Sequence, residues 1–305
     1  MRCFVKSVLL APGMAAACVA AALAATAEAP RLVNARLETR SAATGLERAF
    51  PAAVAAARGP AWIGYAVPGE RRHQMCCWDS ADSAGLGCPG CRLERDGAFT
   101  ARGEDVGTGG GPIPLEGDAS LVVMFRAEDG QLDRIRTFSA GCALDAGGLP
   151  VVWLTDVSPA ESVKLLRSLV GSGLSAGKPG QRVGQPALAA LALHADPSAL
   201  DALVALARQD PSTQVRGQAL FWLAQRAGPK VAGIITRAIE EDPETEVKKR
   251  AVFALSQLPY GEGVPLLVDT ARRNRNPAVR RQAVFWLGQS NYPRALAFFE
   301  EVLKP

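Results

Sequence analysis

The chain has 305 residues, of which 48% are hydrophobic and 21% are charged. This composition excludes a disordered tail protein and a membrane protein with many spans, and the absence of a Gly-X-Y period excludes collagen. The formal net charge of +4 is small for this length, so composition gives no sign of a nucleic-acid or acidic partner. The length suggests two domains of ordinary size.

Residues 1–29 have the features of a signal peptide. Arg2 and Lys6 precede an alanine-rich apolar stretch, and Ala27-Glu28-Ala29 matches the small-x-small pattern that a signal peptidase recognises. We expect cleavage after Ala29, and therefore an exported protein, periplasmic or secreted, with no stable membrane span after cleavage. An uncleaved anchor is the alternative, which the interruption by Pro and Gly and the high alanine content disfavour.

Residues 30–170 are predicted to form a small α+β domain with an antiparallel sheet, and no family is recognised in them. A capping-box pattern from Thr44 to Glu47 predicts a helix that ends near Ala57. A second helix is expected at 158–170. The expected strands are 62–67, 121–126, 132–138 and 151–154, with the Asp129-Gly130 turn of a hairpin between the second and third.

The segment from 68 to 114 is glycine-rich and holds a cluster of cysteines. The candidate disulfide or metal-binding residues are His73, Cys76, Cys77, Cys88 and Cys91, with Cys142 farther along the chain. We expect disulfides, because an exported segment with few apolar side chains cannot build a core of its own. A zinc site and a redox-active Cys-x-x-Cys are the alternatives, and neither the metal nor the disulfide connectivity follows from the spacing.

From residue 182 onward, after a glycine-rich linker at 171–181, the sequence repeats with a period of 32 residues. Similar segments begin at Val215, Val247 and Val279, and a degenerate one begins at Val183. Their shared apolar positions fall on one side of an α-helix, and a turn and a second apolar helix follow each segment. Each unit is therefore predicted to be a helical hairpin that must stack on its neighbours to bury its apolar face.

The repeated pattern, an Asp-Pro pair followed by Val-Arg or Val-Lys and then Ala-Val, resembles HEAT repeats, in particular the short type found in phycobilisome lyases. The resemblance covers residues 180–305 and implies an α-solenoid with an extended surface for binding other macromolecules. It also implies that the basic residue after Val pairs with an acidic residue of an adjacent unit, for which Asp210 and Asp242 are the candidates. We expect a multidomain protein in which the α+β domain precedes an all-α, superhelical solenoid of four HEAT-like repeats at 182–305.

Two recurring sets of side chains in the repeats are candidates for partner binding. The aromatic set is Phe221, Phe253 and Phe285, each with a Gln one helical turn later. The basic set is Arg216, Lys248, Lys249, Arg280 and Arg281. We expect packing between repeats for the aromatic set and ion pairing or simple solvation for the basic set, with partner binding as the alternative for both.

The sequence shows no catalytic constellation: it lacks a Walker loop, a GxSxG elbow and an HExxH motif. Iron-dependent hydroxylases built from HEAT-like repeats use His-Glu pairs as ligands, and neither His73 nor His194 precedes a Glu. His194 is expected to be a capping or surface residue. We predict a non-enzymatic exported scaffold without a cofactor, which binds a protein or peptide of the cell envelope and not nucleic acid. The alternative is an exported enzyme, or a thiol-redox or zinc-binding factor, with its site in the cysteine cluster. The oligomeric state stays open.

Overall fold

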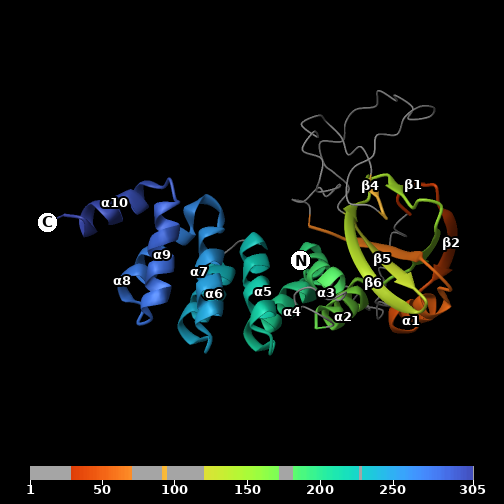
Figure 1. Ribbon diagram of the computed structural model, residues 1–305, viewed down its shortest axis with the longest axis horizontal. Helices are drawn as coiled ribbons and strands as arrows, with labels where there is room; N and C mark the ends of the chain where they lie inside the picture. The colour runs from red at the N-terminus through yellow and green to blue at the C-terminus, as the bar shows by residue number, and fades with distance from the viewer. Residues whose placement is uncertain (1–28, 71–90, 95–119, 172–180, 227–228, 305) are drawn as a thin grey trace, which may run out of the picture.

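A computed structural model describes the chain except residues 1–28, 71–90, 95–119, 172–180, 227–228 and 305. The undescribed residues include the predicted signal peptide except Ala29, and nearly all of the predicted linker. They also include four of the candidate site residues, His73, Cys76, Cys77 and Cys88. Figure 1 shows a strand-rich part at one end of the molecule and a row of helices that extends away from it. Of the helices in the described ranges, none combines the length and the apolar character needed to cross a membrane.

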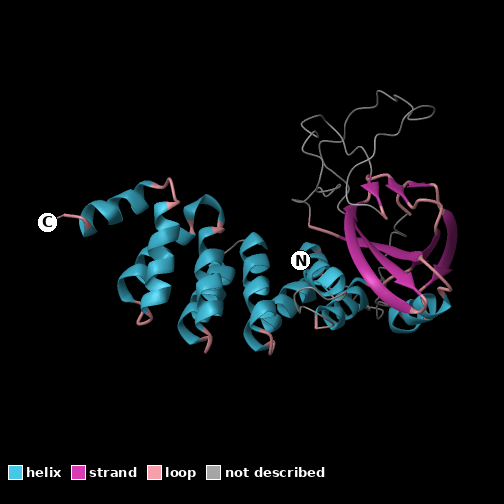
Figure 2. Cartoon of the chain, in the orientation of Figure 1, coloured by secondary structure: helices cyan, strands magenta, loops and turns pink. Residues whose placement is uncertain are grey.

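The N-terminal domain is built on a five-stranded sheet with the strand order β2-β8-β3-β5-β6 (Figure 2). Its strands are β2 (Arg36–Ser41), β3 (Ala61–Pro68), β5 (Ser120–Glu128), β6 (Gln131–Ser139) and β8 (Pro150–Thr155). Strand β5 pairs antiparallel with β3 and β6, whereas β8 runs parallel to both β2 and β3. The sheet is therefore mixed, and the expectation of a wholly antiparallel sheet is wrong for the β2-β8-β3 half.

The parallel half of the sheet follows from the connection between β2 and β3. Helix α1 (Leu46–Ala56) links these two strands, and a helical crossover returns the chain in the same direction instead of reversing it. Strand β2 was not predicted. Its residues are mostly polar and exposed, so it shows no alternation of apolar and polar side chains.

The hairpin of β5 and β6 is confirmed. Asp129 and Gly130 connect the two strands with φ angles of 49° and 76°, the left-handed conformation that both central residues of a type I′ turn adopt. A second, smaller sheet of parallel strands has the order β1-β7-β4, formed by Leu32–Val33, Leu144–Asp145 and Cys91–Arg92.

Two apolar clusters cover the main sheet because alternate residues of a strand point to opposite faces. Tyr65 and Phe125 belong to the larger cluster, whereas Trp62, Met124 and Trp153 belong to the smaller one. The smaller cluster also contains the two described cysteines of the candidate site.

Both predicted helices of the domain are present, but α1 is not capped as the sequence suggested. Its N-cap residue is Gly45, and no side chain of the predicted Thr44–Glu47 box caps it. Instead, the backbone N–H of Leu46 donates to Oε2 of Glu161, at a distance of 3.0 Å. Glu161 lies in α2 (Pro159–Val170), so a contact between two helices replaces the local cap.

The C-terminal part consists of four consecutive helical pairs among the described residues, which confirms the predicted helical hairpins. The first helices of the pairs are α3 (Gln181–Leu193), α5 (Thr213–Arg226), α7 (Thr245–Ser256) and α9 (Pro277–Gly288). The second helices are α4 (Pro197–Gln209), α6 (Pro229–Glu241), α8 (Gly263–Arg273) and α10 (Pro293–Val302). Val247, Leu255 and Leu287 are fully buried, so the repeated apolar positions lie between stacked helices as predicted.

The helical stack continues directly from the N-terminal domain. Helix α3 packs against α2 and β6, and one apolar cluster runs through both parts of the molecule. The end of β3 also extends into the turn between α3 and α4, where the N–H of Glu70 donates to the carbonyl of Leu193 and that of Ala195 donates to Pro68. Arg226 of α5 forms a 2.6 Å ion pair with Glu70.

His194 lies at the centre of this junction and is completely buried, so the expectation of a surface residue is wrong. Its Nδ1 accepts a hydrogen bond from the N–H of Asp196, while Arg226 donates to its backbone carbonyl. Burial lowers the pKa of His194 from 6.5 to about 4; the nearby charge of Arg226 also lowers it, whereas Asp196 raises it. The imidazole is therefore neutral at pH 7.

Candidate functional site

Residues spaced four apart form two parallel rows on the first helices. On α7 the row is Lys249, Phe253 and Gln257, and on α9 it is Arg281, Phe285 and Gln289. Residues at this spacing share one side of a helix. Each row thus carries a cation, an aromatic ring and an amide in the same order. We call this surface, with Phe221 and Gln225 of α5, the first-helix face.

The aromatic rings of the first-helix face contact one another from repeat to repeat. Phe221 stacks on Phe253 at a centroid distance of 5.9 Å, and Phe253 contacts Trp286 at 4.8 Å. Phe285 lies 5.1 Å from Trp286 and is 54% exposed, whereas Phe221 and Phe253 are half-buried. The aromatic set therefore packs between repeats and also leaves part of its surface open to a partner.

The cations of the first-helix face lie either on the helix of their own row or on the next repeat. Lys249 forms a 3.0 Å ion pair with Glu246, and Arg281 is exposed, with no ion-pair partner in the part of the chain that the structure describes. On α5 the corresponding position is Gly217. A Cβ there would lie 2.2 Å from Cδ of Arg250, so only glycine lets the Arg250 side chain of the next repeat lie over α5. Arg250 thus places a cation on α5, and its Nη1 also donates to the backbone carbonyl of Gln214 at 3.3 Å.

Three residues of the predicted basic set serve the solenoid itself. Arg216 donates from Nε and Nη2 to the two carboxylate oxygens of Asp242, at 2.8 and 3.1 Å, and both side chains are buried. This confirms the predicted pairing, and the hydrogen bond to Asp242 raises the pKa of Arg216 above its ordinary value. Lys248 and Arg280 donate to the backbone carbonyls of Glu240 and Asn274.

An Asp or Asn directly before Pro predicts a helix cap at Asp210, Asp242 and Asn276. The prediction is confirmed for Asn276, which accepts a hydrogen bond from the N–H of Ala278 at the start of α9. It is wrong for Asp210 and Asp242. Each accepts a hydrogen bond from the backbone N–H two residues later, at 2.9 Å, and the helix begins one residue after that N–H. Asn274 makes the same turn at the next 32-residue step. These residues fix the loop that leads into each first helix.

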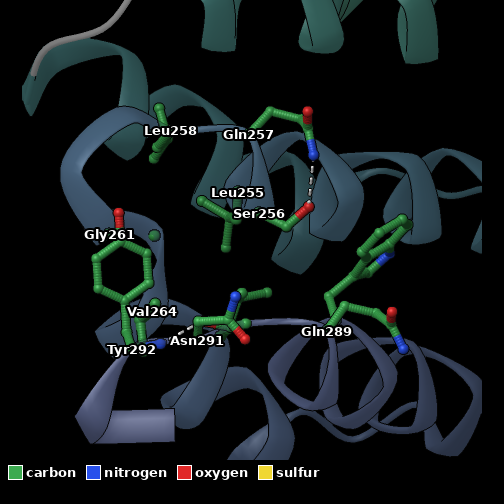
Figure 3. Close-up of a pocket in the computed structure, with 13 residues that line it drawn as sticks. Leu255, Ser256, Gln257, Leu258, Gly261, Val264, Gln289, Asn291 and Tyr292 are labelled. Atoms are coloured by element: carbon green, nitrogen blue, oxygen red, sulfur yellow. Dashed lines mark hydrogen bonds between the residues drawn. The ribbon is translucent and has the colours of Figure 1, made fainter.

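A pocket of about 460 Å³ lies beside the first-helix face, between the third and fourth helical pairs (Figure 3). Leu255, Leu258 and Val264 supply apolar walls, and polar side chains surround them. The polar lining residues are Ser256, Gln257, Gln289, Ser290 and Asn291. The side-chain amide of Gln257 donates to Ser256 Oγ at 3.1 Å, as Figure 3 shows.

Two aromatic residues complete the pocket. The Tyr292 ring lies over Gly261, where a Cβ would approach it to 2.6 Å, so a larger residue at 261 would displace this wall. Trp286 lines the pocket, and its indole nitrogen is shielded from solvent without an acceptor among the described residues. Sequence reasoning missed this pocket because its residues come from three helices, α7, α8 and α9, and from the turns after α7 and α9.

The structure brings together two of the candidate cysteines. Cys91 and Cys142 are both buried, and their sulfur atoms lie 3.6 Å apart. Burial raises the pKa of the Cys142 thiol to about 12, although the charge of Arg136 opposes this. Within the described ranges, no group of three or more His, Cys, Asp or Glu residues is arranged to hold a metal ion. The other members of the predicted zinc set lie outside those ranges.

A family model for HEAT repeats matches residues 174–256 and 231–305. No curated protein matches the chain.

Three solved structures are similar to parts of the chain. The epoxyqueuosine reductase of Bacillus subtilis is 25% identical over 30% of this chain and 28% of its own, with a TM-score of 0.25. YibA of Escherichia coli is 20% identical over 48% of this chain and 54% of its own, with a TM-score of 0.31. Human deoxyhypusine hydroxylase is 21% identical over 48% of this chain and 74% of its own, with a TM-score of 0.17. The chain thus spans about a quarter of the reductase and half of YibA. By the family match, the C-terminal part of this protein, residues 174–305, consists of HEAT repeats.

Proposed function

We propose that this protein is an exported, non-enzymatic scaffold that binds a protein or peptide of the cell envelope through its HEAT repeats. The observation that carries the proposal is the first-helix face, where cations, aromatic rings and amides recur in the same order on neighbouring helices. In this face Phe285 and Arg281 are exposed, and Phe221 and Phe253 are only half-buried, so the face is accessible to a partner.

The chemistry of the face favours an extended, acidic segment of the partner that crosses the first helices. The rings of Phe253 and Phe285 offer apolar contact, and Arg250, Lys249 and Arg281 favour carboxylates. The amides of the Gln residues can both donate to and accept from the backbone of such a segment. The pocket beside Trp286 has room for one side chain of the segment.

Synthetic peptides test this proposal with the full chain. A peptide of about ten residues spans three helices spaced roughly 10 Å apart. We expect labelled peptides that alternate Asp with Phe or Leu to bind, and matched peptides with Lys in place of Asp to fail. Fluorescence anisotropy should show that Arg281→Glu weakens binding at least about tenfold, because it reverses one charge on the face.

The matched control is Arg237→Glu, which makes the same change on α6, away from the first-helix face. We expect it to change affinity by no more than about twofold. If the two variants lose equal amounts of peptide affinity, only the net charge of the protein matters. If no acidic peptide binds, the proposed chemistry of the partner is refuted.

Export and disulfide formation belong to the same proposal. The alanine-rich leader supports export, and the contact between the sulfurs of Cys91 and Cys142 supports a cysteine cluster that includes residue 142. Disulfides within this cluster would stabilise the segment that joins β3 to β5, which has few apolar side chains. The high pKa of Cys142 disfavours a role for it as an attacking thiolate.

Mass spectrometry of unreduced protein, recovered from an exporting host and treated with iodoacetamide, tests this part. We expect a mature chain that begins at Pro30 and in which four of the five remaining cysteines, Cys76, Cys77, Cys88, Cys91 and Cys142, resist alkylation until reduction. Alkylation of all five without reduction, together with bound zinc, would support the zinc-binding alternative instead.

A further inference from the structure

A pocket of about 420 Å³ lies in the N-terminal domain, between the end of α1 and the β2-β8-β3 half of the main sheet. Its floor is apolar, because Ala53 and Ala57 of α1, Ile63 of β3 and Val152 of β8 line it and are all buried. The volume falls within the range of roughly 300–1,000 Å³ that is typical of small-molecule sites. We call this site the β2 pocket.

Strand β2 gives the β2 pocket a charged margin. In the register of the sheet, Glu38 of β2 lies beside Val152, which in turn lies beside Ile63. Residues in register point to the same face of a sheet, and residues two apart on one strand share that face. Arg36 and Arg40 therefore lie, with Glu38, on the face that carries the apolar floor, and all three line the pocket.

Two of the three arginines that line the pocket carry an unneutralised charge. Arg40 donates from Nε and Nη2 to the two carboxylate oxygens of Glu38, at 2.7 and 3.1 Å. These hydrogen bonds hold the pKa of Glu38 below its usual value, so the two opposite charges cancel. Arg36, and Arg58 from the loop between α1 and β3, are exposed and have no ion-pair partner within the described part of the chain.

Protection of the sheet edge is another role for the charges on β2. This strand is an edge of the five-stranded sheet, and charged side chains on an edge strand disfavour pairing with other chains. Edge protection does not account for Arg58, which comes from a different segment and lines the same pocket. It also does not account for the apolar floor that these arginines border.

We propose that the β2 pocket binds a small organic carboxylate, whose apolar part lies on the floor and whose charged group is bound by Arg36 and Arg58. The N–H groups of a guanidinium match the two oxygens of a carboxylate in spacing and direction. Contact with Ile63 and Val152 removes the apolar part of the ligand from water. The pocket belongs to the N-terminal domain, so this proposal does not depend on the first-helix face of the repeats.

Isothermal titration calorimetry of the full chain with 4-phenylbutanoate tests the class of ligand. We expect a dissociation constant below about 1 mM, and binding of the neutral 4-phenylbutanamide that is at least about tenfold weaker. Acetate has the charge without the apolar part and should also bind at least about tenfold more weakly. Equal affinity for the amide would overturn the carboxylate, and equal affinity for acetate would overturn the apolar floor. The whole proposal falls if 4-phenylbutanoate, benzoate and octanoate all fail to bind at millimolar concentration.

Substitution of the two unneutralised arginines locates the bound carboxylate. Arg36→Gln and Arg58→Gln should each weaken binding of 4-phenylbutanoate at least about fivefold. Both side chains are exposed, so the thermal midpoint of each variant should stay within about 2 °C of the wild-type value. The matched control is Arg48→Gln, which removes the charge of an exposed arginine of α1 that does not line the pocket, and we expect a change of less than about twofold. An equal loss in all three variants would overturn the site.

Arg281→Glu separates this proposal from the proposed function. It should weaken binding of the acidic peptides but change the affinity for 4-phenylbutanoate by less than about twofold, whereas Arg36→Gln should have the opposite effect. If Arg281→Glu removed carboxylate binding and Arg36→Gln did not, the ligand would lie on the first-helix face, and the β2 pocket would be refuted as its site.

Discussion

Asp242→Asn should lower the free energy of unfolding by about 3 kcal/mol, because it leaves the buried Arg216 guanidinium without its ion-pair partner. The wild-type carboxylate accepts two hydrogen bonds from Arg216 and a third from the N–H of Glu244, so one side chain joins α5 to the loop before α7. Urea unfolding at pH 7, followed by circular dichroism, measures the loss.

The matched control is Glu246→Gln, in the first turn of the helix that follows Asp242. It breaks an ion pair of similar length, between Lys249 and Glu246, but one that is exposed, and we expect a loss of less than about 1 kcal/mol. Adding Arg216→Met to Asp242→Asn should restore part of the stability, because it removes the uncompensated charge. A loss with Asp242→Asn as small as the control loss would show that the buried pair is not a major link between repeats.

Stability should fall by about 3 kcal/mol between pH 6.5 and pH 4 through His194 alone. The pKa of this residue is about 4 in the folded protein and about 6.5 when unfolded, so the unfolded chain binds a proton more readily. The contribution is fully present above pH 6.5 and is lost as the pH falls to 4. Protonation would also place a second donor at Nδ1 against the N–H of Asp196.

His194→Asn separates this effect from the titration of carboxylates, because its side-chain oxygen can accept the same hydrogen bond but does not titrate. Urea unfolding at several pH values measures the free energy of unfolding of both proteins. The value for the wild type relative to the variant should be highest above pH 6.5 and should decrease as the pH falls. A difference that stays constant from pH 7 to pH 4 would mean that His194 does not titrate as its burial predicts.

The repeats were predictable from sequence because their signal is periodic and mostly local. Each first helix shows the 3.6-residue apolar pattern on its own, and the recurrence of that pattern every 32 residues is enough to place Val247 and Leu255 between stacked helices. The same holds for the Asp129-Gly130 hairpin, whose turn chemistry is contained in two residues.

The failed expectations concern interactions between distant parts of the chain. The polar strand β2 is specified by its pairing with β8, the cap of α1 is Glu161 of another helix, and His194 is buried because β3 extends over its turn. None of these contacts leaves a local pattern in the sequence. The mixed sheet was missed for the same reason.

The candidate site was predictable in part. The spacing of Phe253 and Phe285 from their Gln residues showed the aromatic ladder, but not that Lys249 and Arg281 complete the same rows. Four-residue spacing from each Phe would have separated these two cations from Lys248 and Arg280, which bond to backbone carbonyls. The pocket beside Trp286 could not be predicted, because it depends on how successive pairs stack.

The position of Arg250 over Gly217 means that the order of the repeats matters as well as their number. The α5 row takes its positive charge from the unit that follows it. If residues 242–273 were deleted as one whole unit, α9 would become the neighbour of α5, and Gln282 would stand where Arg250 stands now. Such a shortened protein would keep its period but would lose the ring of Phe253 and the positive charge that lies over α5, so gain or loss of units would change the chemistry of the first-helix face.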